Sequence, residues 1–195
     1  EGGTSAWSFL NSRDGILWIG GFGGTLYRVD PSRKDIPYSF LGALVFTFEE
    51  DLSQQLWIGT DKGIFVKNRK TGAIRQFVND SQNPNSLSGN SANRILCDPS
   101  GTIWAGTNNG LNRFNPKTRS FTRYQHDAED DASLSETDFI NIIADGGGDS
   151  LWIGTSTGLD LMMKTTGKFK HFRHHAEDNN SIGGNNIVSL MPEKS

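Results

Sequence analysis

The chain of 195 residues is 34% hydrophobic and 10% aromatic, and it carries a formal net charge of −3 at pH 7. These values predict one globular domain with a sizeable core and exclude a disordered chain. Nucleic-acid binding is excluded because no basic run is longer than residues 68–70. The longest apolar run, 41–48, is far shorter than the roughly 18 residues of a membrane span, which excludes membrane contact by this segment.

A five-residue phrase, Leu-Trp-Ile-Gly-Thr, recurs along the chain and contains four of the five tryptophans. It is intact at 56–60 and 151–155 and lightly altered at 17–21 and 103–107. The tryptophans are 39, 47 and 48 residues apart (57 minus 18, 104 minus 57, 152 minus 104). Such periods are typical of propeller blades or solenoid units. The structural repeat positions are Trp18, Trp57, Trp104, Trp152, Gly20, Gly59, Gly106 and Gly154.

Each repeat contains four short runs that are rich in β-branched and aromatic residues and separated by Gly, Pro, Asn or Asp, a pattern that predicts four strands joined by hairpins. The predicted strands, in chain order, are 6–10, 16–20, 25–29 and a less regular run at 37–41; 43–49, 55–60, 63–67 and 73–78; 93–97, 102–107, 111–115 and 120–125; and 139–145, 151–155, 158–163 and 168–173. One more strand, 186–191, resembles the first strand of a fifth repeat.

A second shared phrase lies between the later repeats. Residues 85–88, 132–135 and 180–183 occupy one repeat position, and each follows a polar stretch. We interpret them as surface connections that one apolar residue ties down. The junction between the first and second repeats lacks this insert, which accounts for the shorter first interval.

Alternation along the repeated strand places apolar groups on both faces of each sheet. Leu56, Ile58 and Thr60 share one face, and Trp57 and Gly59 share the other. Sheets stacked face to face around an axis cover one another, as in a propeller, with Trp filling the space between blades and Gly leaving room for a bulky neighbour. The alternative, an up-and-down barrel, does not predict a four-strand period.

The predicted fold class is therefore all-β: a β-propeller, as a partial ring of four four-stranded antiparallel blades plus the first strand of a fifth. Residues 1–195 form one such domain. The predicted blades span 6–41, 43–78, 92–125 and 139–173, and the extra strand spans 186–191.

The repeated pattern is an Asp and a short turn, Leu-Trp-Ile-Gly-Thr, a two-residue break, Gly-Leu, Asn/Asp-Pro-x-Thr-Gly and an aromatic strand ending near Ser-Leu-Ser. It resembles the two-component regulator propeller repeat from about Ala6 to Met191. The pattern departs from that repeat at 21–24, at 65–67 and at Ala105. The resemblance implies a periplasmic, non-enzymatic sensor region of an inner-membrane receptor with a histidine kinase, and many such receptors respond to oligosaccharides.

Four repeats and one further strand are fewer than the seven blades of the rings in that family. We expect a piece of a longer array whose first and last blades expose apolar faces. The expected partners are therefore a second copy, giving a dimer, or the remaining blades of the parent propeller. An oligosaccharide is the expected ligand.

Clusters that could support chemistry are weak. His171, His174 and His175 lie close together, but His174 is in register with His126, which favours a structural role over a metal site. The acidic residues of 127–131 lack the spacing of a calcium loop. Most carboxylates fall at repeated turn positions, such as Asp14, Asp51, Asp98 and Asp145, so no catalytic pair stands out. Cys97, the only cysteine, is interpreted as a buried structural thiol. No catalytic residue, metal or cofactor is predicted.

Ligand contacts are expected on the loops at one end of the central channel, where amides and hydroxyls can bond sugar hydroxyls. The candidate ligand-binding residues are Phe22, Asp61, Lys62, Asn90, Asn93, Asn108, Asn109, Thr137, Asp138, Ser156, Thr157, Asn185 and Asn186. The alternatives to a sensor are a propeller glycosidase or lyase and a protein-interaction scaffold.

Overall fold

The computed structural model describes residues 6–21, 23–135 and 139–191, and their secondary structure is entirely strands and turns. None of the described segments forms a helix that could span a bilayer. The strands are β1 (Ala6–Asn11), β2 (Leu17–Gly21), β3 (Thr25–Val29), β4 (Tyr38–Phe40), β5 (Val45–Glu50), β6 (Leu56–Thr60), β7 (Gly63–Lys67), β8 (Ile74–Phe77), β9 (Ala92–Cys97), β10 (Ile103–Thr107), β11 (Gly110–Asn115), β12 (Ser120–Tyr124), β13 (Ile140–Asp145), β14 (Ser150–Thr155), β15 (Leu159–Met163) and β16 (Lys168–Phe172).

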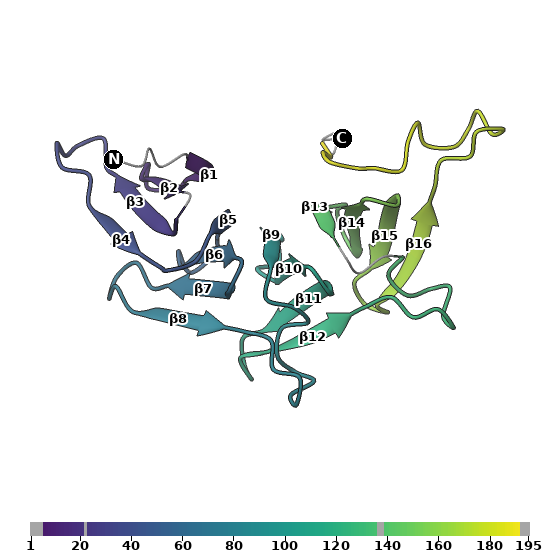
Figure 1. The fold of residues 1–195 in the computed structure, drawn as a ribbon, viewed down its shortest axis with the longest axis horizontal. Coiled ribbons are helices and arrows are strands. Elements are labelled where there is room, and N and C mark those ends of the chain that lie inside the picture. The colour runs from purple at the N-terminus through teal and green to yellow at the C-terminus, as the bar shows by residue number, and fades with distance from the viewer. Residues whose placement is uncertain (1–5, 22, 136–138, 192–195) are drawn as a thin grey trace.

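These strands form four antiparallel sheets of four strands, each in sequence order. We call the sheets blades 1 to 4 and the strand positions within each blade a to d. Figure 1 shows the blades side by side in an arc, with β1, β5, β9 and β13 along the inner edge and β4, β8, β12 and β16 along the outer edge. The prediction of a partial propeller of four-stranded antiparallel blades is confirmed.

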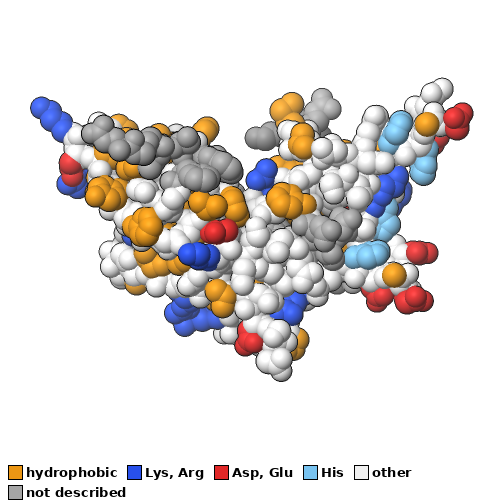
Figure 2. Space-filling view, viewed as in Figure 1, with side chains coloured by type: hydrophobic (Ala, Val, Ile, Leu, Met, Phe, Trp, Pro, Cys, Tyr) orange, Lys and Arg blue, Asp and Glu red, His pale blue; other side chains and the backbone are white. Residues whose placement is uncertain are grey.

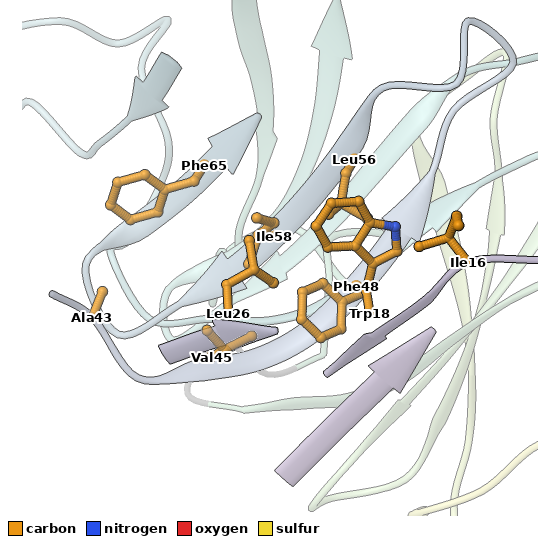
Figure 3. Close-up of a cluster of buried hydrophobic side chains, with 9 residues drawn as sticks. All are labelled: Ile16, Trp18, Leu26, Ala43, Val45, Phe48, Leu56, Ile58 and Phe65. Carbon is orange, nitrogen blue, oxygen red and sulfur yellow. The ribbon is translucent and has the colours of Figure 1, made fainter. Parts of the chain in front are cut away.

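The hydrophobic core lies between the blades, in three separate layers. The layer between blades 1 and 2 is drawn in Figure 3, where Trp18 of blade 1 lies beside Phe48 of blade 2. A second layer contains Trp57 with Ile95 of the next blade, and a third contains Trp104 with Ile143. Each repeated Trp at these interfaces therefore fills the space between neighbouring blades, as predicted.

The repeated Gly of strand b is where the next blade approaches most closely. A Cβ added at Gly20 would lie 2.6 Å from Val45, and one at Gly106 would lie 2.7 Å from Ile140. In blade 2 the approaching group is the backbone carbonyl of Ala92, against Gly59. The absence of a side chain at this position lets strand a of one blade lie against strand b of the preceding one.

The a–b turn is linked to the repeated Trp by one carboxylate. The indole Nε1–H of Trp57 donates to Asp51 Oδ2 at 2.9 Å, and that of Trp104 donates to Asp98 Oδ2 at 3.1 Å. Asp51 and Asp98 stand six residues before the Trp, and Ser12 and Gly146 occupy this position in blades 1 and 4.

The same register corrects one sequence prediction. Asp14 and Asp145 are not the counterparts of Asp51 and Asp98, because they lie two residues after and one residue before the equivalent position. The four a–b turns have the same length, each closed by a backbone hydrogen bond over four residues, so Asp14 and Asp145 occupy other positions around the same turn.

The connections from strand d to the next strand a lie along the outer edge of the following blade. Leu87 and Leu134 are fully buried there, as the insert phrase predicts. Asn85 O accepts a 2.7 Å hydrogen bond from Phe121 N, and Ala132 O accepts one of 2.9 Å from Phe169 N. These bonds cover backbone groups of strand d that an edge strand would otherwise expose.

A buried polar group on strand c holds the inserts at 85–88 and 132–135. Asn112 Oδ1 accepts from Ser88 N at 2.8 Å, and Asn112 Nδ2 donates to Ser88 Oγ at 2.8 Å. In blade 4, Asp160 Oδ2 accepts from Ser135 N at 3.0 Å. The equivalent residue of blade 2 is Phe65, in the strand that departs from the repeat pattern. Phe65 is buried against blade 1, where no insert needs a polar partner.

Asn112→Ala is expected to lower the free energy of unfolding by about 2–3 kcal/mol, because Ser88 N would lose its buried acceptor. Urea unfolding followed by tryptophan fluorescence measures this change. Asn180→Ala, at an exposed loop position whose side chain bonds none of the described residues, is the control and should change stability by less than about 0.5 kcal/mol. Equal losses in the two variants would contradict the anchoring role.

The prediction of a strand at 186–191 is wrong, because these residues do not pair with another strand among the described residues. The segment still approaches blade 4 as a strand a would, because Ile187 N donates to Thr155 O at 2.9 Å and Ile187 packs against Gly154. Within the described residues it has no strand b to pair with, so it stays extended against the preceding blade.

Candidate ligand-binding sites

Two of the predicted ligand-binding residues clamp the b–c turn to the start of strand a. Asp61 Oδ1 accepts from Leu44 N at 2.7 Å, and Asp61 N donates to Leu44 O at 3.2 Å. Asn108 makes the same pair of bonds with Ser91, at 3.1 Å and 3.0 Å. Their side-chain oxygens are therefore used within the fold.

The other predicted residues that the structure describes lie at the same end of the blades, and most also bond turn groups. Asn90 Oδ1 accepts from Asn79 N, Asn185 Oδ1 accepts from His174 N, and Asn186 Oδ1 accepts from Asn141 Nδ2. The remaining contacts are Lys62 Nζ to Gly42 O, Asn109 Nδ2 to Ser88 O, and Thr157 Oγ1 with Thr155 Oγ1, while Ser156 is exposed. Phe22, Thr137 and Asp138 lie outside the described residues.

Asn93 differs from the other candidates because it is buried. Its side chain, on β9, is only 5% exposed; Oδ1 accepts from Ser91 Oγ at 3.1 Å. Its Nδ2 has no hydrogen-bond partner among the residues that the structure describes. A buried amide donor without a partner is uncommon in folded proteins. Asn93 is therefore the candidate whose polar group is least explained by the fold itself.

The clefts of the molecule open at the opposite end, where the a–b and c–d turns meet. One of about 530 Å³ lies between blades 3 and 4, over Trp104, and one of about 490 Å³ lies between blades 1 and 2, over Trp18. A third, of about 440 Å³, lies beside Trp57. The predicted ligand-binding residues line none of these three clefts.

A cation at the start of the c–d turn bridges two blades in two of these clefts. Lys164 of blade 4 contacts Asp145 at 2.6 Å and Asp98 of blade 3 at 3.3 Å. Burial opposes its charge, yet the hydrogen bonds that Lys164 donates to the two carboxylates raise its pKa. Arg69 occupies the same position in blade 2 and pairs with Glu50 at 2.7 Å and with Asp14 of blade 1.

The Asp98 carboxylate at the floor of the larger cleft stays ionised for several reasons. Burial alone would raise its pKa, but hydrogen bonds from Ser100, Trp104 and Thr102 and the charge of Lys164 hold the pKa below its usual value. Lys164 lies between Asp98 and Asp145, so one ammonium group pairs with two carboxylates. An ionised Asp98 lacks the proton that a general acid for glycoside cleavage requires.

Glu49 at the end of β5 is a half-buried carboxyl that faces the blade 2 and blade 3 interface. Burial raises its pKa to about 7, while backbone N–H groups of Glu50 and Cys97 favour the ionised form. Cys97 is also half-buried, and burial together with the Glu49 charge raises the pKa of its thiol. A thiol in this state is a poor nucleophile, which agrees with a structural role.

The raised pKa of Glu49 makes folding depend on pH. Its contribution to stability is complete below pH 4.5, the usual pKa, and is lost as the pH rises through about 7. We expect the Glu49→Gln variant to be more stable than the wild type at pH 8 by about 2–3 kcal/mol and close to it at pH 5. Urea unfolding at the two pH values tests this, with the exposed Glu129→Gln as control. A Glu49→Gln variant that shows no pH-dependent gain would contradict the interpretation.

The histidines serve the connections. His126 Nδ1 bonds Leu134 O at 3.0 Å and His174 Nδ1 bonds Ile182 O at 2.8 Å, so the two are equivalent, as the register predicts. His171 bonds Asp160 Oδ1 at 2.8 Å. Figure 2 shows the histidines on the side of the arc that carries β16. Over the described ranges, no group of three or more His, Cys, Asp or Glu residues could hold a metal ion.

Two of the functional features were missed at the sequence level. These are the clefts between blades and the substitution of Ser12 for the Asp that bonds the Trp. Counting six residues back from each tryptophan identifies Ser12. No comparable pattern predicts the clefts, because turns of two different blades form the cleft over Trp104.

Residues 86–109 match a sequence model of the family described as "Two component regulator propeller", which confirms the resemblance of the repeat. No curated protein matches the chain. Among solved structures, the extracellular domain of the hybrid two component system BT3049 from B. thetaiotaomicron is 20% identical, with a TM-score of 0.73 over 87% of this chain. The corresponding domain of BT4673 is 18% identical, with a TM-score of 0.75 over 94% of this chain.

The chain spans only 24% of the length of each of these two domains. It also covers 56% of virginiamycin B lyase from Staphylococcus aureus, which is 15% identical, with a TM-score of 0.69 over 88% of this chain. At these identities the likeness is one of fold: all three contain stacked blades of the kind described above.

Proposed function

We propose that the chain is part of the non-enzymatic, ligand-sensing propeller of a two-component signalling receptor. The observation that carries this proposal is the regulator-propeller match at 86–109, in a repeat that runs in register through four blades. Similarity to extracellular domains of hybrid two component systems supports a position outside the inner membrane. The proposed ligand is an oligosaccharide, and the proposed output domain is a histidine kinase.

The end of the blades that carries the b–c turns is the proposed oligosaccharide contact. Its amides and hydroxyls offer both donors and acceptors, and Asn93 Nδ2 is a buried donor without a protein partner among the described residues. The alternative ligand surface, the set of clefts at the opposite end, is treated separately below.

Signalling would follow from a change in how two propeller regions sit against each other. Blades are rigid because their cores lie between them. A ligand that favours one relative placement would shift the population of receptors toward it. That shift would pass through a membrane helix to the kinase.

The proposal is tested in cells that carry the parent receptor and a transcription reporter of its output. Purified oligosaccharides are supplied one at a time, and we expect one of them to activate the wild-type receptor. Asn93→Ala should reduce the response at least tenfold in ligand concentration, while the exposed Asn11→Ala should not. No response to any oligosaccharide, or full response in Asn93→Ala, would overturn the ligand class or the site respectively.

A second part of the proposal concerns the free face of blade 1. Phe9, Tyr38 and Phe40 are 77%, 72% and 71% exposed, and Ile19 is half-buried where Ile58 of blade 2 is fully buried. We propose that a further blade of the parent propeller, or a second copy of the chain, covers this face. The purified chain should then associate with rising concentration in sedimentation experiments, and Tyr38→Asp should reduce that association. A monomer at every concentration would contradict self-association.

A further inference from the structure

The cleft between blades 1 and 2 differs in charge from the rest of this acidic chain. Four basic side chains line it, with one carboxylate: Arg28, Lys67, Arg69, Lys70 and Asp14. Trp18 also lines the cleft, and hydroxyl and amide groups come from Ser53, Gln54, Gln55 and Asn68. A cleft of this size and polarity suits a small, polar, anionic molecule.

Trp18 at this cleft carries a buried donor without a partner. Its side chain is 3% exposed, and Nε1–H has no acceptor among the described residues. Figure 3 shows this nitrogen on the Ile16 side of the core layer, next to the a–b turn. Ser12, which replaces the acceptor Asp of blades 2 and 3, already bonds Asp14 Oδ1 and Ile16 O, each at 2.7 Å.

Blade 3 shows what the complete arrangement looks like. There the Asp98 carboxylate lies between two donors, Trp104 Nε1–H at 3.1 Å and Lys164 Nζ at 3.3 Å. At blades 1 and 2 both donors are present, as Trp18 and Arg69, whose Cζ lies over the Trp18 ring at 5.8 Å. The carboxylate between them is the part that Ser12 does not supply.

The cations around this position are only partly neutralised. Arg69 pairs with Glu50 and with Asp14, whose side chain is 45% exposed and is therefore a weakly held partner. Arg28 pairs with Asp30. Lys67 and Lys70 have no carboxylate within 4.0 Å in the part of the chain that the structure describes.

We propose that this cleft binds the carboxylate of a small hydroxylated acid, such as a sugar acid, in the place that the Asp98 carboxylate takes in blade 3. One carboxylate oxygen accepts from Trp18 Nε1–H. The other accepts from Arg69, which exchanges Asp14 for the ligand. Lys67 and Lys70 attract the anion, and the hydroxyl and amide groups of the cleft bond its hydroxyls. This site is separate from the oligosaccharide contact proposed above, and it stands or falls independently of it.

The test follows the indole N–H signals of the purified chain by proton–nitrogen NMR, with the Trp18 signal assigned from Trp18→Phe. Sodium glucuronate is the probe, and glucose and sodium acetate are the comparison ligands. We expect glucuronate to shift the Trp18 signal saturably, acetate to act at least tenfold more weakly, and glucose to have no effect. A Trp18 shift with acetate as strong as that with glucuronate would contradict a site for a hydroxylated acid. A shift with glucose would contradict recognition of the ligand through its carboxylate.

Ser12→Asp is the most direct test, because it places in blade 1 the carboxylate that blades 2 and 3 have at this position. It should keep or raise the thermal midpoint and abolish the glucuronate shift. Ser32→Asp adds the same charge at an exposed turn and should leave binding within twofold of the wild type. Arg69→Gln should weaken binding at least tenfold. Undiminished binding in Ser12→Asp, or no shift in the wild type, would overturn the proposal.

Discussion

Gly59→Ala is expected to lower the free energy of unfolding by about 3 kcal/mol or more. The new Cβ would meet the backbone carbonyl of Ala92 and the side chain of Thr47. A backbone carbonyl in a ladder cannot turn aside as a flexible side chain does, so blades 2 and 3 would have to separate. Urea unfolding at fixed pH measures the loss.

Gly183→Ala is the matched control, because nothing lies within 4 Å of a Cβ at this exposed position. Its stability should stay within about 0.5 kcal/mol of the wild type. A Gly59→Ala variant as stable as Gly183→Ala would show that the blades are not in contact at strand b.

Trp104→Ala is expected to cost about 3–5 kcal/mol. The side chain is fully buried between blades 3 and 4, its indole bonds Asp98, and Arg113 lies over its ring with Cζ 5.7 Å from the centroid. Its removal would leave a large cavity and take one of two donors from the buried Asp98 Oδ2, which Lys164 also contacts. Thermal and urea unfolding should both report the change.

The same substitution in blade 4 provides the control within the repeat. Trp152 is half-buried, and Gly146 stands where an Asp would accept its N–H. Trp152→Ala should therefore cost clearly less, about 1–2 kcal/mol, chiefly through lost contact with Phe172. Equal costs for Trp104→Ala and Trp152→Ala would contradict the interblade role assigned to Trp104.

The strands were predictable because the same pattern of apolar and turn residues recurs in all four repeats. β3 (Thr25–Val29) and β7 (Gly63–Lys67) match their predicted ranges residue for residue, and the Trp and Gly of the repeated phrase pack between blades as alternation requires. The odd apolar strand c of blade 2 is explained by structure: Phe65 faces a junction without an insert. The junction before blade 2 therefore lacks the insert, and strand c of blade 2 lacks the buried amide that would hold an insert.

The details that failed depend on neighbours rather than on local pattern. Residues 186–191 have strand composition, but a strand forms only where another strand accepts its hydrogen bonds. Asp14 and Asp145 follow turn composition, but only the residue six before the Trp, which opens the turn, bonds the indole in blades 2 and 3. The clefts are formed by turns of two adjacent blades, so a pattern within one repeat does not show them.

The sensing function is tested most directly by following one oligosaccharide through binding and recovery. The purified propeller region that contains this chain is titrated calorimetrically with the oligosaccharide that activates the proposed receptor, and the sugar is then recovered and analysed by chromatography and mass. A sensor predicts saturable binding and complete recovery of the intact sugar. Shortened or unsaturated products that accumulate with time would identify a glycosidase or a lyase, and no binding at all would contradict the sensor.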